Sequence, residues 1–488
     1  MIIEPSQIQY ESQTMKNKFY ITTAIPYVNA KPHIGHALEF VQGDVIARFH
    51  RLLGEEALLL SGSDENALKN VQAAEILGEE VQSFIDKNAQ FFKDLADKLD
   101  VKFDVFQKGS DQKTHFPSSQ KLWQLCDQNG DIYKKTYKGL YCLGCEAFYT
   151  PEELNPEGEC YEHPGKKLEL VEEENYFFKL SKYQDQIIKL IESDELRIIP
   201  QSRKNEVLSF LKEPLQDISI SRSNERAKNW GVPVPDDPNQ RVYVWFDALN
   251  IYQSGIGFGW DKEKYNKWWP ADVHVIGKGI IRFHAVYWPA FLISAGLKLP
   301  KSLFVHEYIT VEGQKMSKTL GNVLDPIPLI GKYGTDPLRY YLLSKLSPFA
   351  DGDFSMERFT ESYNADLANG LGNLVARVAR LAEKNEVTAP SLPTKLDPEM
   401  EKYLAEYKFN DALSHIWKEI AEADKKVNET KPWELSGEDA KEVLIDLVSR
   451  IQHIAYNLQP FLPSTAEEIL NQFSGQVKSQ ASLFPRIS

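Results

Sequence analysis

The spacing of apolar residues near the N-terminus predicts a strand, a helix and a second strand. Residues 18–24 (KFYITTA) form a short apolar, β-branched run that is typical of a strand. A loop with two prolines follows. From residue 34 to residue 52, apolar positions recur at steps of three and four, which predicts a helix that stops at Gly54. Residues 57–60 are apolar again. This order is typical of an open α/β sheet, in which ligands bind beyond the carboxyl ends of the strands.

A different pattern begins near Phe359, where glycine and proline become rare and helical periodicity dominates. The leucine and valine positions between 367 and 381 form one apolar stripe, and Asn373 and Arg377 share a face beside it. Residues 431–433 (KPW) are expected to open a later helix, because proline is tolerated in a first helical turn. The C-terminal part is therefore predicted to be all-α.

Composition narrows the class of protein. The 488 residues allow about three or four domains, and a hydrophobic fraction of 42% supports large cores. No uncharged apolar run is long enough to span a membrane, and the acidic N-terminus resembles neither a secretory signal nor a transit peptide. The net charge of -14 argues against general coating of nucleic acid, although a local basic face can still bind RNA phosphates. A cytoplasmic protein is expected.

The cysteines indicate a metal site. Cys142 and Cys145 form one close pair, and Cys160 and His163 form a second, which together fit a tetrahedral zinc site. Four protein ligands leave no open position, so we expect one structural zinc ion rather than a catalytic one. The alternative is a set of reduced thiols with a surface histidine. Cys126 stands apart and is expected to be a core thiol.

Residues 32–36 (PHIGH) lie where the first strand leads into the helix. His33 and His36 are therefore expected at a helix N-terminus, where backbone N–H groups favour anions. Both imidazoles can donate to phosphate oxygens as negative charge develops, and Gly35 allows an adenine ring to approach the backbone. The alternative is a pair of helix-capping histidines without a ligand.

Residues 315–319 (KMSKT) lie in a polar segment flanked by glycines, which predicts a loop. Lys315 and Lys318 offer positive charges for a triphosphate or pyrophosphate, whereas the alternative is a solvated surface loop. Taken with residues 32–36, this segment predicts a site that holds ATP from two sides and stabilises charge on the α-phosphate. That is the chemistry of adenylate formation.

These two segments resemble the signature motifs of class I aminoacyl-tRNA synthetases. Four further segments resemble the methionyl-tRNA synthetase family: residues 24–29 (AIPYVN), 174–180 (ENYFFKL), 242–248 (VYVWFDA) and 282–289 (RFHAVYWP). The resemblance extends from about Lys18 to the end of the chain. It implies that the chain activates L-methionine with ATP to methionyl-adenylate and pyrophosphate, with Mg²⁺ accompanying ATP, and then transfers methionine to the 3′ end of tRNA(Met).

The resemblance also implies an α/β fold with a defined domain order. A Rossmann-like parallel-sheet catalytic domain is split by an insertion with the zinc knuckle, and an all-α anticodon-binding helix bundle follows. The expected parts are an N-terminal extension (1–17), the first half of the catalytic domain (18–115), the connective insertion (116–234), the second half with the lysine loop (235–325), a stem-contact linker (326–358) and the helical domain (359–488).

Site residues follow from matching positions. Asp64, beyond the second strand, is a candidate partner for the substrate ammonium, with a turn-forming aspartate as the alternative. For methionine, the resemblance implies a pocket of Ile25, Tyr27, Trp245, Ala248, Leu249, Tyr252, Ile280, Phe283, His284 and Trp288. For ATP it implies His33, Gly35, His36, Gly277 and Lys318, with His33, His36, Lys315 and Lys318 catalytic. For the tRNA anticodon it implies Asn373, Arg377 and Trp433. Without the resemblance, the tryptophans would be assigned to cores and helix packing.

The chain departs from the family pattern in three places. Gly279 stands where most relatives carry an aspartate, which would be expected to bind the ribose hydroxyls of ATP; backbone groups near Gly277 are the expected substitute. One cysteine knuckle is present where many members carry two. The sequence stops where longer relatives continue into a further tRNA-binding, dimer-forming domain, so a monomer is expected.

Three rival interpretations remain at this point. A class I synthetase for cysteine would need zinc with an open position for the substrate thiolate, which four protein ligands do not leave. A small-molecule nucleotidyltransferase shares the His-x-Gly-His element but has no need of the C-terminal helices. A catalytically silent tRNA-binding protein is disfavoured by the intact histidines and lysines, whereas Gly279 favours it.

Overall fold

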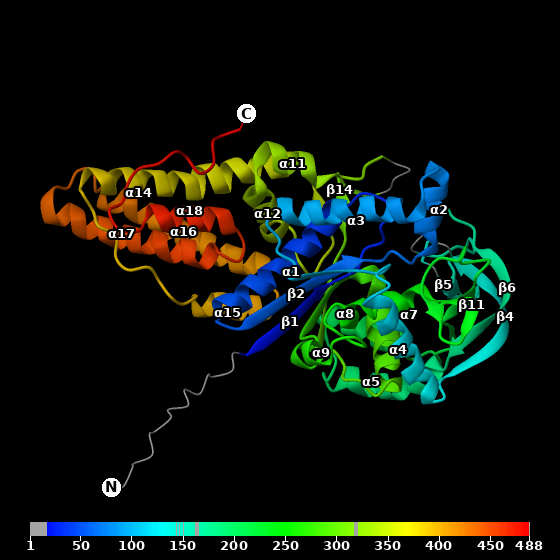
Figure 1. Cartoon of the computed structure of the whole chain (residues 1–488). Helices are drawn as coiled ribbons and strands as arrows, with labels where there is room; N and C mark the ends of the chain where they lie inside the picture. The colour runs from blue at the N-terminus through cyan, green and yellow to red at the C-terminus, as the bar shows by residue number, and fades with distance from the viewer. Residues whose placement is uncertain are drawn as a thin grey trace, which may run out of the picture.

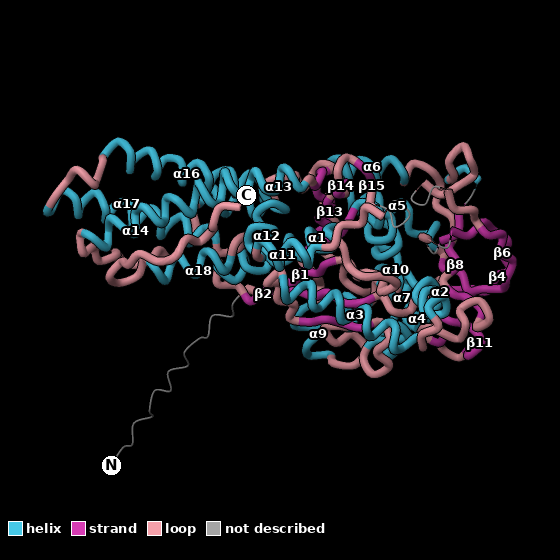
Figure 2. The backbone as a smooth tube through the Cα atoms, turned by 90° about the horizontal axis from the view of Figure 1, so that it is seen from above, coloured by secondary structure: helices cyan, strands magenta, loops and turns pink. Residues whose placement is uncertain are grey.

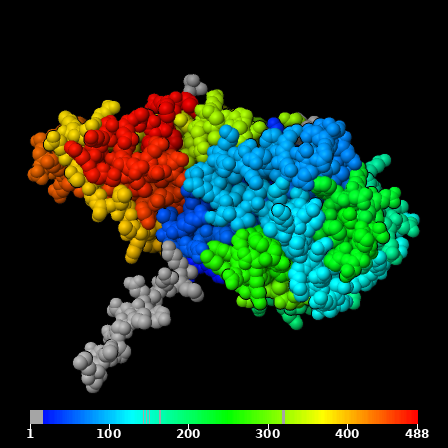
Figure 3. Space-filling view, in the orientation of Figure 1, coloured from blue at the N-terminus to red at the C-terminus, as the bar shows by residue number. Residues whose placement is uncertain are grey.

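The molecule consists of an α/β region and an elongated helical bundle that extends from one side of it (Figure 1). The computed structural model describes residues 17–487 except 143, 146, 150, 162–164 and 317–320. Two residues predicted to act in the site, His163 and Lys318, lie outside the described residues. Figure 3 shows the bundle in yellow to red, joined to the α/β region through the blue and yellow-green segments.

The α/β region is built on a six-stranded parallel sheet with the order β3-β2-β1-β12-β13-β7. Its strands are β1 (Lys18–Thr23), β2 (Glu56–Ser63), β3 (Val105–Lys108), β7 (Arg197–Ile199), β12 (Val273–Gly277) and β13 (Ser302–His306). The chain builds outward from β1 to β3 and returns on the other side of β1 with β12. The order therefore reverses between β1 and β12, which is where open parallel sheets bind ligands.

Both faces of the sheet are buried, as in other parallel sheets. Ile21, Val275 and Phe304 belong to the core on one face, where α1 (Ile34–Leu52) and α3 (Val81–Lys98) pack. The neighbouring residues Tyr20 and Ile276 belong to the core on the other face. That second face is covered by α4 (His115–Gln128), α7 (Val244–Ala248), α8 (Ile251–Ser254) and α10 (Trp288–Ser294). Adjacent residues of one strand thus enter different cores, which explains why the strands read as continuous apolar runs.

Two small antiparallel sheets, drawn at the right of Figure 1, are built from the segment expected to be an insertion together with β11, which lies just after it. One consists of β4 (Ile132–Cys142), β5 (Ala147–Tyr149), β6 (Glu169–Phe178) and β8 (Ile218–Ser219). The other consists of β9 (Ser221–Ser223), β10 (Pro233–Val234) and β11 (Asp237–Val242). Between β6 and β8 in sequence, β7 leaves the segment and pairs in parallel with β13 at the edge of the main sheet. The main sheet therefore takes one strand from residues 116–234.

The remaining elements lead around the sheet and into the bundle. They are α2 (Leu68–Leu77), α5 (Gln184–Glu192), α6 (Gln201–Phe210), α9 (Lys262–Trp268), β14 (Ile309–Val311), β15 (Gln314–Lys315), α11 (Pro326–Tyr333), α12 (Thr335–Ser344), β16 (Gly352–Phe354) and α13 (Met356–Ser362). The bundle proper consists of α14 (Asn373–Lys384), α15 (Pro398–Ala405), α16 (Phe409–Thr430), α17 (Gly437–Leu458) and α18 (Pro463–Gln472).

The bundle shares its hydrophobic core with the α1 face of the sheet. Figure 2 shows α12 between the bundle and α1. The predicted apolar stripe is confirmed, since Leu367, Leu374 and Val378 are fully buried. The predicted helix at residues 431–433 is wrong. Lys431 adopts a left-handed conformation with φ of 44° after the end of α16, so this segment is a turn, and α17 begins only at Gly437. Among the described residues, no helix is both long and apolar enough to cross a bilayer.

Candidate active site

A cavity of about 450 Å³ opens at the point where the strand order reverses. The described walls come from five parts of the chain: the loop after β1 with the start of α1, Phe92 of α3, the segment of α7 and α8, the segment after β12, and residues 308–323. The described residues that line it include the predicted His33, His36, Ile25, Tyr27, Trp245, Ala248, Leu249, Tyr252, Gly277, Ile280 and His284. Eleven predicted positions from distant parts of the sequence therefore meet at one cavity.

The two signature segments lie on the same cavity. Met316, in the second segment, lines it together with His33 and His36 of the first. A Cβ atom placed on Gly35 would lie 3.9 Å from Met316 Cε. Lys315 is exposed, and its Nζ lies 5.7 Å from the ring centroid of Tyr308, which also lines the cavity. A ligand in the cavity is therefore within reach of both segments.

The histidines cap helix α1 and are fixed in one orientation by its first turn. His33 Nδ1 accepts the backbone N–H of Gly35 at 3.1 Å, and His36 Nδ1 accepts the backbone N–H of His33 at 3.1 Å. In each imidazole the δ nitrogen is thus an acceptor, so a neutral ring carries its proton on Nε2. Burial, reinforced by His33 and His306, holds the pKa of His36 well below 6.5. His36 is therefore neutral at pH 7 and offers an Nε2–H donor. Capping and ligand binding, which the sequence presented as alternatives, are compatible.

Gly35 is required for this arrangement. A Cβ atom at this position would lie 2.9 Å from His33 Cε1 and 3.1 Å from His33 Nδ1, which is closer than real Cβ contacts allow. Any side chain at position 35 would displace the imidazole from its capping position. The glycine thus serves the geometry of His33, a role that the sequence did not indicate.

Stacked aromatic rings form the wall to which α7 contributes Trp245. Trp245 stacks on Phe283 with ring centroids 3.7 Å apart and planes 5° apart, and Tyr27 meets Trp245 edge-on at 6.3 Å. Phe283 lies behind Trp245 rather than in the lining. The indole Nε1–H of Trp245 donates to the backbone carbonyl of Cys145 at 3.1 Å. The cavity wall is therefore held by the loop that carries the cysteines.

Tyr252 and His284 form a buried polar pair in an otherwise apolar wall. The Nδ1–H of His284 donates to the carbonyl of Ile280 at 3.0 Å, because a carbonyl can only accept. His284 Nε2 is then the acceptor for the Tyr252 hydroxyl, at 2.8 Å. Burial lowers the pKa of His284 to about 4, and the hydrogen bond to Ile280 offsets only part of this effect. The pair is neutral at pH 7 and presents one polar edge to a bound side chain.

Trp288 and Asp64, which like Phe283 were predicted to bind the substrate methionine, also lie behind the residues that line the cavity. Trp288 is fully buried, and its Nε1–H donates to His274 Nε2 at 3.3 Å. Asp64 is 3% exposed, and its backbone pairs with the lining residue Tyr27 in a parallel bridge. Both residues support the wall from behind in this structure, and neither is among the described lining residues.

The cavity also contains polar residues that were not predicted from the sequence. Glu39 is the one acidic residue among the described lining residues, and its Oε2 lies 2.9 Å from His306 Nε2. It stands three positions after His36, close to one helical turn further along α1, so helical spacing was the signal that could have found it. Gly279, where the family pattern has an aspartate, lines the same cavity. A carboxylate is thus present, from a different element.

A second missed group is a buried network behind α7. Asp247 is 1% exposed and sits between the lining residues Trp245 and Ala248. Its Oδ1 lies 2.9 Å from Nε2 of the fully buried His115 and accepts the Ser119 hydroxyl, and its Oδ2 accepts the Asn66 side-chain amide at 2.7 Å. The partners come from α4 and from the segment after β2, so no local pattern could have shown the network.

Three cysteines converge beside the cavity wall. The Sγ atoms of Cys142, Cys145 and Cys160 lie within 4.8 Å of one another, and those of Cys145 and Cys160 are 3.3 Å apart. A zinc ion with Zn–S distances of about 2.3 Å in a tetrahedron has S–S edges of about 3.8 Å, so this donor set fits a soft divalent metal. The predicted fourth ligand, His163, lies outside the described residues. Cys126 is fully buried, which confirms it as a core thiol, and burial raises its pKa to about 12.

The predicted anticodon residues lie on the bundle, away from the cavity. Arg377 and Trp433 are close together, with the guanidinium carbon 6.0 Å from the indole centroid. Arg377 also donates to Asp424 Oδ1 and Asn428 Oδ1 of α16, both at 2.8 Å. Trp433 is 46% exposed, and Asn373 is exposed at the start of α14. Residues distant in the sequence thus form a cationic and aromatic surface.

The comparisons with known proteins agree with this geometry. A family model described as tRNA synthetases class I (M) matches residues 19–379. The methionine–tRNA ligase of Clostridium acetobutylicum is 43% identical over 493 residues, which cover 96% of this chain and 75% of that protein. The methionine–tRNA ligase of Thermotoga maritima is 42% identical over 481 residues, covering 94% of this chain and 76% of that protein.

Comparison with solved structures indicates the same family. The methionyl-tRNA synthetase of Mycobacterium tuberculosis in complex with methionyl-adenylate superimposes with a TM-score of 0.89 and 35% sequence identity. The match covers 96% of this chain and 100% of that one. Sequence and structure therefore agree over nearly the whole chain, and the chain belongs to the methionyl-tRNA synthetases, a family of ATP-dependent class I aminoacyl-tRNA ligases.

Proposed function

We propose that the cavity of about 450 Å³ is the site at which this chain activates L-methionine with ATP before transferring it to the 3′ end of tRNA(Met). The observation that carries the proposal is the meeting of the two signature segments on one cavity, with His33 and His36 on one side and Met316 on the other. A silent tRNA-binding protein would have no need for this arrangement.

In the first step, the methionine carboxylate attacks the α-phosphorus of ATP. The bond between this phosphorus and the oxygen bridging to the β-phosphate breaks, and pyrophosphate leaves with Mg²⁺ as its counter-ion. His33 and His36 donate from Nε2 to the α-phosphate oxygens, while Lys315 and Lys318 neutralise the leaving phosphates. No side chain acts as a nucleophile, so catalysis rests on positioning and on charge stabilisation.

In the second step, a hydroxyl of the terminal ribose of tRNA attacks the carbonyl carbon of methionyl-adenylate. The bond from that carbon to the phosphate oxygen breaks and AMP leaves. The same imidazole donors then face the phosphate of the leaving AMP, so one constellation serves both steps.

The apolar wall is assigned to the methionine side chain. Trp245, Tyr27 and Ile280 supply apolar surface for a flexible thioether, and the Tyr252–His284 pair supplies one weak polar contact for sulfur. Asp64, whose backbone pairs with the lining residue Tyr27, is assigned as the partner of the substrate ammonium group. Glu39 takes the ribose hydroxyls of ATP in place of the aspartate missing at Gly279, because it is the one acid among the described lining residues.

The cysteine cluster is assigned to one structural zinc ion held by Cys142, Cys145, Cys160 and His163. Zinc supplies no chemistry to the reaction in this role. It fixes the loop whose Cys145 carbonyl accepts the Trp245 indole N–H, and so holds one wall of the methionine pocket.

The exposed surface on the bundle is assigned to the anticodon of tRNA(Met). Trp433 can stack on an unpaired base, while Arg377 and Asn373 hydrogen-bond base edges. Trp433→Ala should lower the rate of tRNA charging at least tenfold, whereas methionine-dependent pyrophosphate exchange should not change, because the cavity lies in the other part of the molecule. A parallel loss of pyrophosphate exchange would contradict this assignment. The monomeric state of the chain stays a prediction, which light scattering can test.

The decisive experiment is amino-acid-dependent exchange of pyrophosphate into ATP, measured across the twenty amino acids. Exchange with methionine is expected, and exchange with cysteine instead would refute the substrate. Lys315→Met should reduce exchange at least a hundredfold, as expected when a group that stabilises transition-state charge is lost. Lys332→Met is the matched control, because Lys332 is also exposed and lies 4.9 Å from a tyrosine ring, but on α11 outside the cavity lining. Equal activities of the two variants would exclude Lys315 from catalysis.

A further inference from the structure

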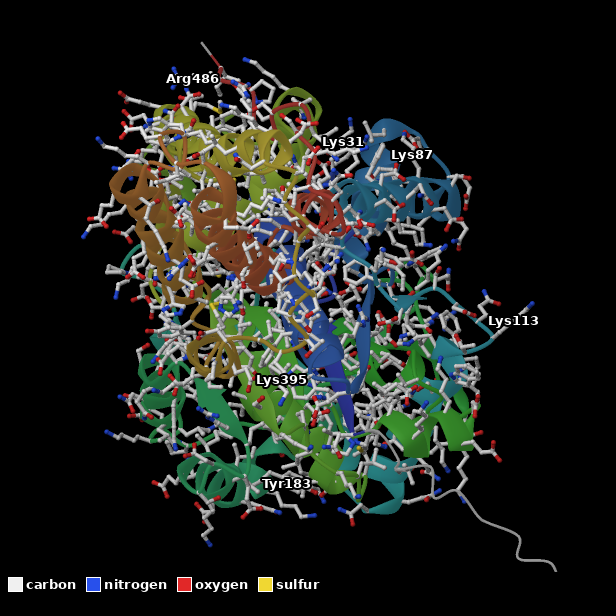
Figure 4. The ribbon with its side chains drawn as sticks, turned by 90° about the vertical axis from the view of Figure 1, so that its left-hand side faces the viewer. Lys31, Lys87, Lys113, Tyr183, Lys395 and Arg486 are labelled. Atoms are coloured by element: carbon white, nitrogen blue, oxygen red, sulfur yellow. The ribbon has the colours of Figure 1, made fainter. Side chains whose placement is uncertain are left out.

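A cluster of metal-ligating side chains lies in the bundle, apart from the cavity and from the cysteines. Asp397 precedes α15, Glu419 lies on α16 and His453 lies on α17. One ligand atom from each of these three residues lies within 4.8 Å of the other two. In Figure 4, Lys395 marks the segment that leads into α15 and Asp397. Three helices of the bundle therefore contribute to one small volume.

The distances from His453 to the two carboxylates are longer than direct hydrogen bonds and close to the separations of ligands around a metal. His453 Nε2 lies 3.5 Å from Glu419 Oε1 and 3.8 Å from Asp397 Oδ2. Hydrogen bonds of this kind are about 2.7–3.2 Å long. A tetrahedral zinc site with metal–ligand distances of about 2.0–2.1 Å has edges of about 3.3–3.4 Å, and a trigonal plane has edges of about 3.6 Å.

Two buried polar atoms point to an additional partner. Glu419 Oε2 and His415 Nε2 are buried and have no hydrogen bond to any described residue. His415 lies one turn before Glu419 on α16, and its Nε2 is 3.4 Å from Asp397 Oδ1. Buried polar atoms without a hydrogen bond are costly, at about 1–3 kcal/mol each, so such groups usually have a partner. These atoms are independent of the ligand distances and indicate the same position.

The surroundings hold the ligands in place. The Asp397 carboxylate accepts the backbone N–H of Glu399 at 2.8 Å and caps α15, while its own N–H donates to Asn457 Oδ1 at 2.9 Å. Asn457 Nδ2 also donates to the His453 carbonyl at 2.9 Å and lies 3.2 Å from His453 Nε2, and an ion bound to Nε2 would replace this second contact. A cavity of about 290 Å³ lined by Glu419 and His453 reaches the cluster, which gives an ion a path of entry.

We propose that Asp397, Glu419 and His453 bind a second divalent transition-metal ion, such as Zn²⁺, and that His415 is close enough to act as a fourth ligand. Two carboxylates with one or two imidazoles form a set of oxygen and nitrogen donors that binds Zn²⁺. The ion would join the start of α15 to α16 and α17. Arg377 is held by Asp424 and Asn428 on α16, so the ion would stiffen the helix that supports the tRNA-facing surface.

The test uses the full chain with its cysteine site already loaded with zinc and then dialysed against metal-free buffer. Titration with Zn²⁺ should show one further equivalent per chain. Glu419→Gln and His453→Gln should each weaken this second equivalent at least tenfold. Glu422→Gln is the matched control, since Glu422 is an exposed acid on α16 that lines the same cavity but lies outside the ligand cluster. Pyrophosphate exchange by each variant reports that the chain has folded.

A spectroscopic measurement on the unaltered chain makes the test independent of the variants. X-ray absorption of the second zinc equivalent should show only nitrogen and oxygen neighbours. A sulfur shell would place the ion at the cysteines and overturn the proposal. Absence of a second equivalent, or equal affinity in Glu419→Gln and Glu422→Gln, would also overturn it and would identify the cluster as an ordinary ion-pair network.

Discussion

The buried arginine that joins helix α1 to the bundle gives the sharpest stability prediction. Arg339 of α12 is fully buried, and its Nη2 lies 2.8 Å from Oδ2 of Asp44 on α1, which is also fully buried. Its Nε donates to the carbonyl of Phe461 at 2.7 Å, and Nη1 and Nη2 donate to the carbonyls of Leu99 and Pro460, both at 3.0 Å. One side chain therefore links the helix that carries the histidines to the turn before α18.

Replacement of Arg339 by methionine keeps the apolar stem but removes the charge. The Asp44 carboxylate keeps Arg48, whose Nε lies 2.6 Å from Oδ2, but loses its fully buried partner. Three backbone carbonyls also lose a donor. Breaking a buried ion pair by removing one partner costs about 3–5 kcal/mol. Because Arg48 still compensates part of the carboxylate charge, we expect Arg339→Met to lower the free energy of unfolding by about 3 kcal/mol.

The assay is equilibrium unfolding in urea, followed by tryptophan fluorescence, with the change in free energy taken from the midpoint and the slope. Lys425→Met is the control, because Lys425 pairs with Glu429 at 3.7 Å on the surface and is 72% exposed. An exposed pair of this kind contributes at most about 0.5 kcal/mol. The double variant Asp44→Asn/Arg339→Met should be more stable than Arg339→Met, since it removes the carboxylate charge that has lost its fully buried partner.

The reasoning would be refuted if Arg339→Met and Lys425→Met shifted the urea midpoint equally. It would also fail if the double variant were less stable than Arg339→Met alone. Either result would mean that the hydrophobic contacts of the shared core, rather than the ion pair, hold α1 to the bundle.

Three further predictions concern the pocket. Burial lowers the pKa of His284 to about 4, so the folded chain binds fewer protons than the unfolded one between pH 4 and 6.5. The stability that depends on this residue being neutral, on the order of 3 kcal/mol, should be present above pH 6.5 and be lost as the pH falls toward 4. His284→Phe should flatten this part of the pH dependence when unfolding in urea is measured at a series of pH values. Asp247→Asn should raise the KM for methionine in pyrophosphate exchange while kcat changes little, because it weakens the buried bond to His115 that positions Trp245 and Ala248; an unchanged KM would show that the network is dispensable for the pocket. Removal of metal by a chelator should also raise the KM for methionine, because the Cys145 carbonyl anchors the Trp245 indole; zinc release measured with a colorimetric dye should parallel the change, and metal loss without a change in KM would contradict the link.

Local patterns were enough to predict the elements that carry the two signature segments. Helix α1 spans Ile34–Leu52, as the apolar spacing predicts, since its cap and its buried face are both encoded within the helix itself. Strands β1 and β2 were placed to within a few residues for the same reason. The meeting of residues 32–36 with residue 316 was predicted from the chemistry of the two segments taken together and from the family resemblance, because nothing local in either segment specifies the other.

What the sequence did not predict depends on partners distant along the chain. Strand β7 has three residues, too few for a recognisable alternation, and is a strand because β13 lies beside it. The turn at Lys431 depends on one left-handed residue that carries no glycine signature. Asp247 reads as part of a family motif, but its partner His115 lies on α4, so only the fold reveals that the carboxylate is buried and paired.

The protonation state of the histidines determines which groups can supply positive charge to a ligand in the cavity. Because the pKa of His36 is held well below 6.5, His36 can donate a hydrogen bond at pH 7 but brings no positive charge to the phosphates. A charged imidazole at this depth would itself need a counter-ion, and the capping bonds to backbone N–H groups require an unprotonated Nδ1. In the mechanism proposed above, the charge that offsets a triphosphate therefore comes from cationic side chains near the cavity mouth, such as the exposed Lys315, and from the Mg²⁺ proposed to accompany ATP. We therefore propose that a rigid, neutral donor pair on α1, combined with cations supplied from a separate loop, lets pyrophosphate leave together with its counter-charges while the donors stay in place for the second step.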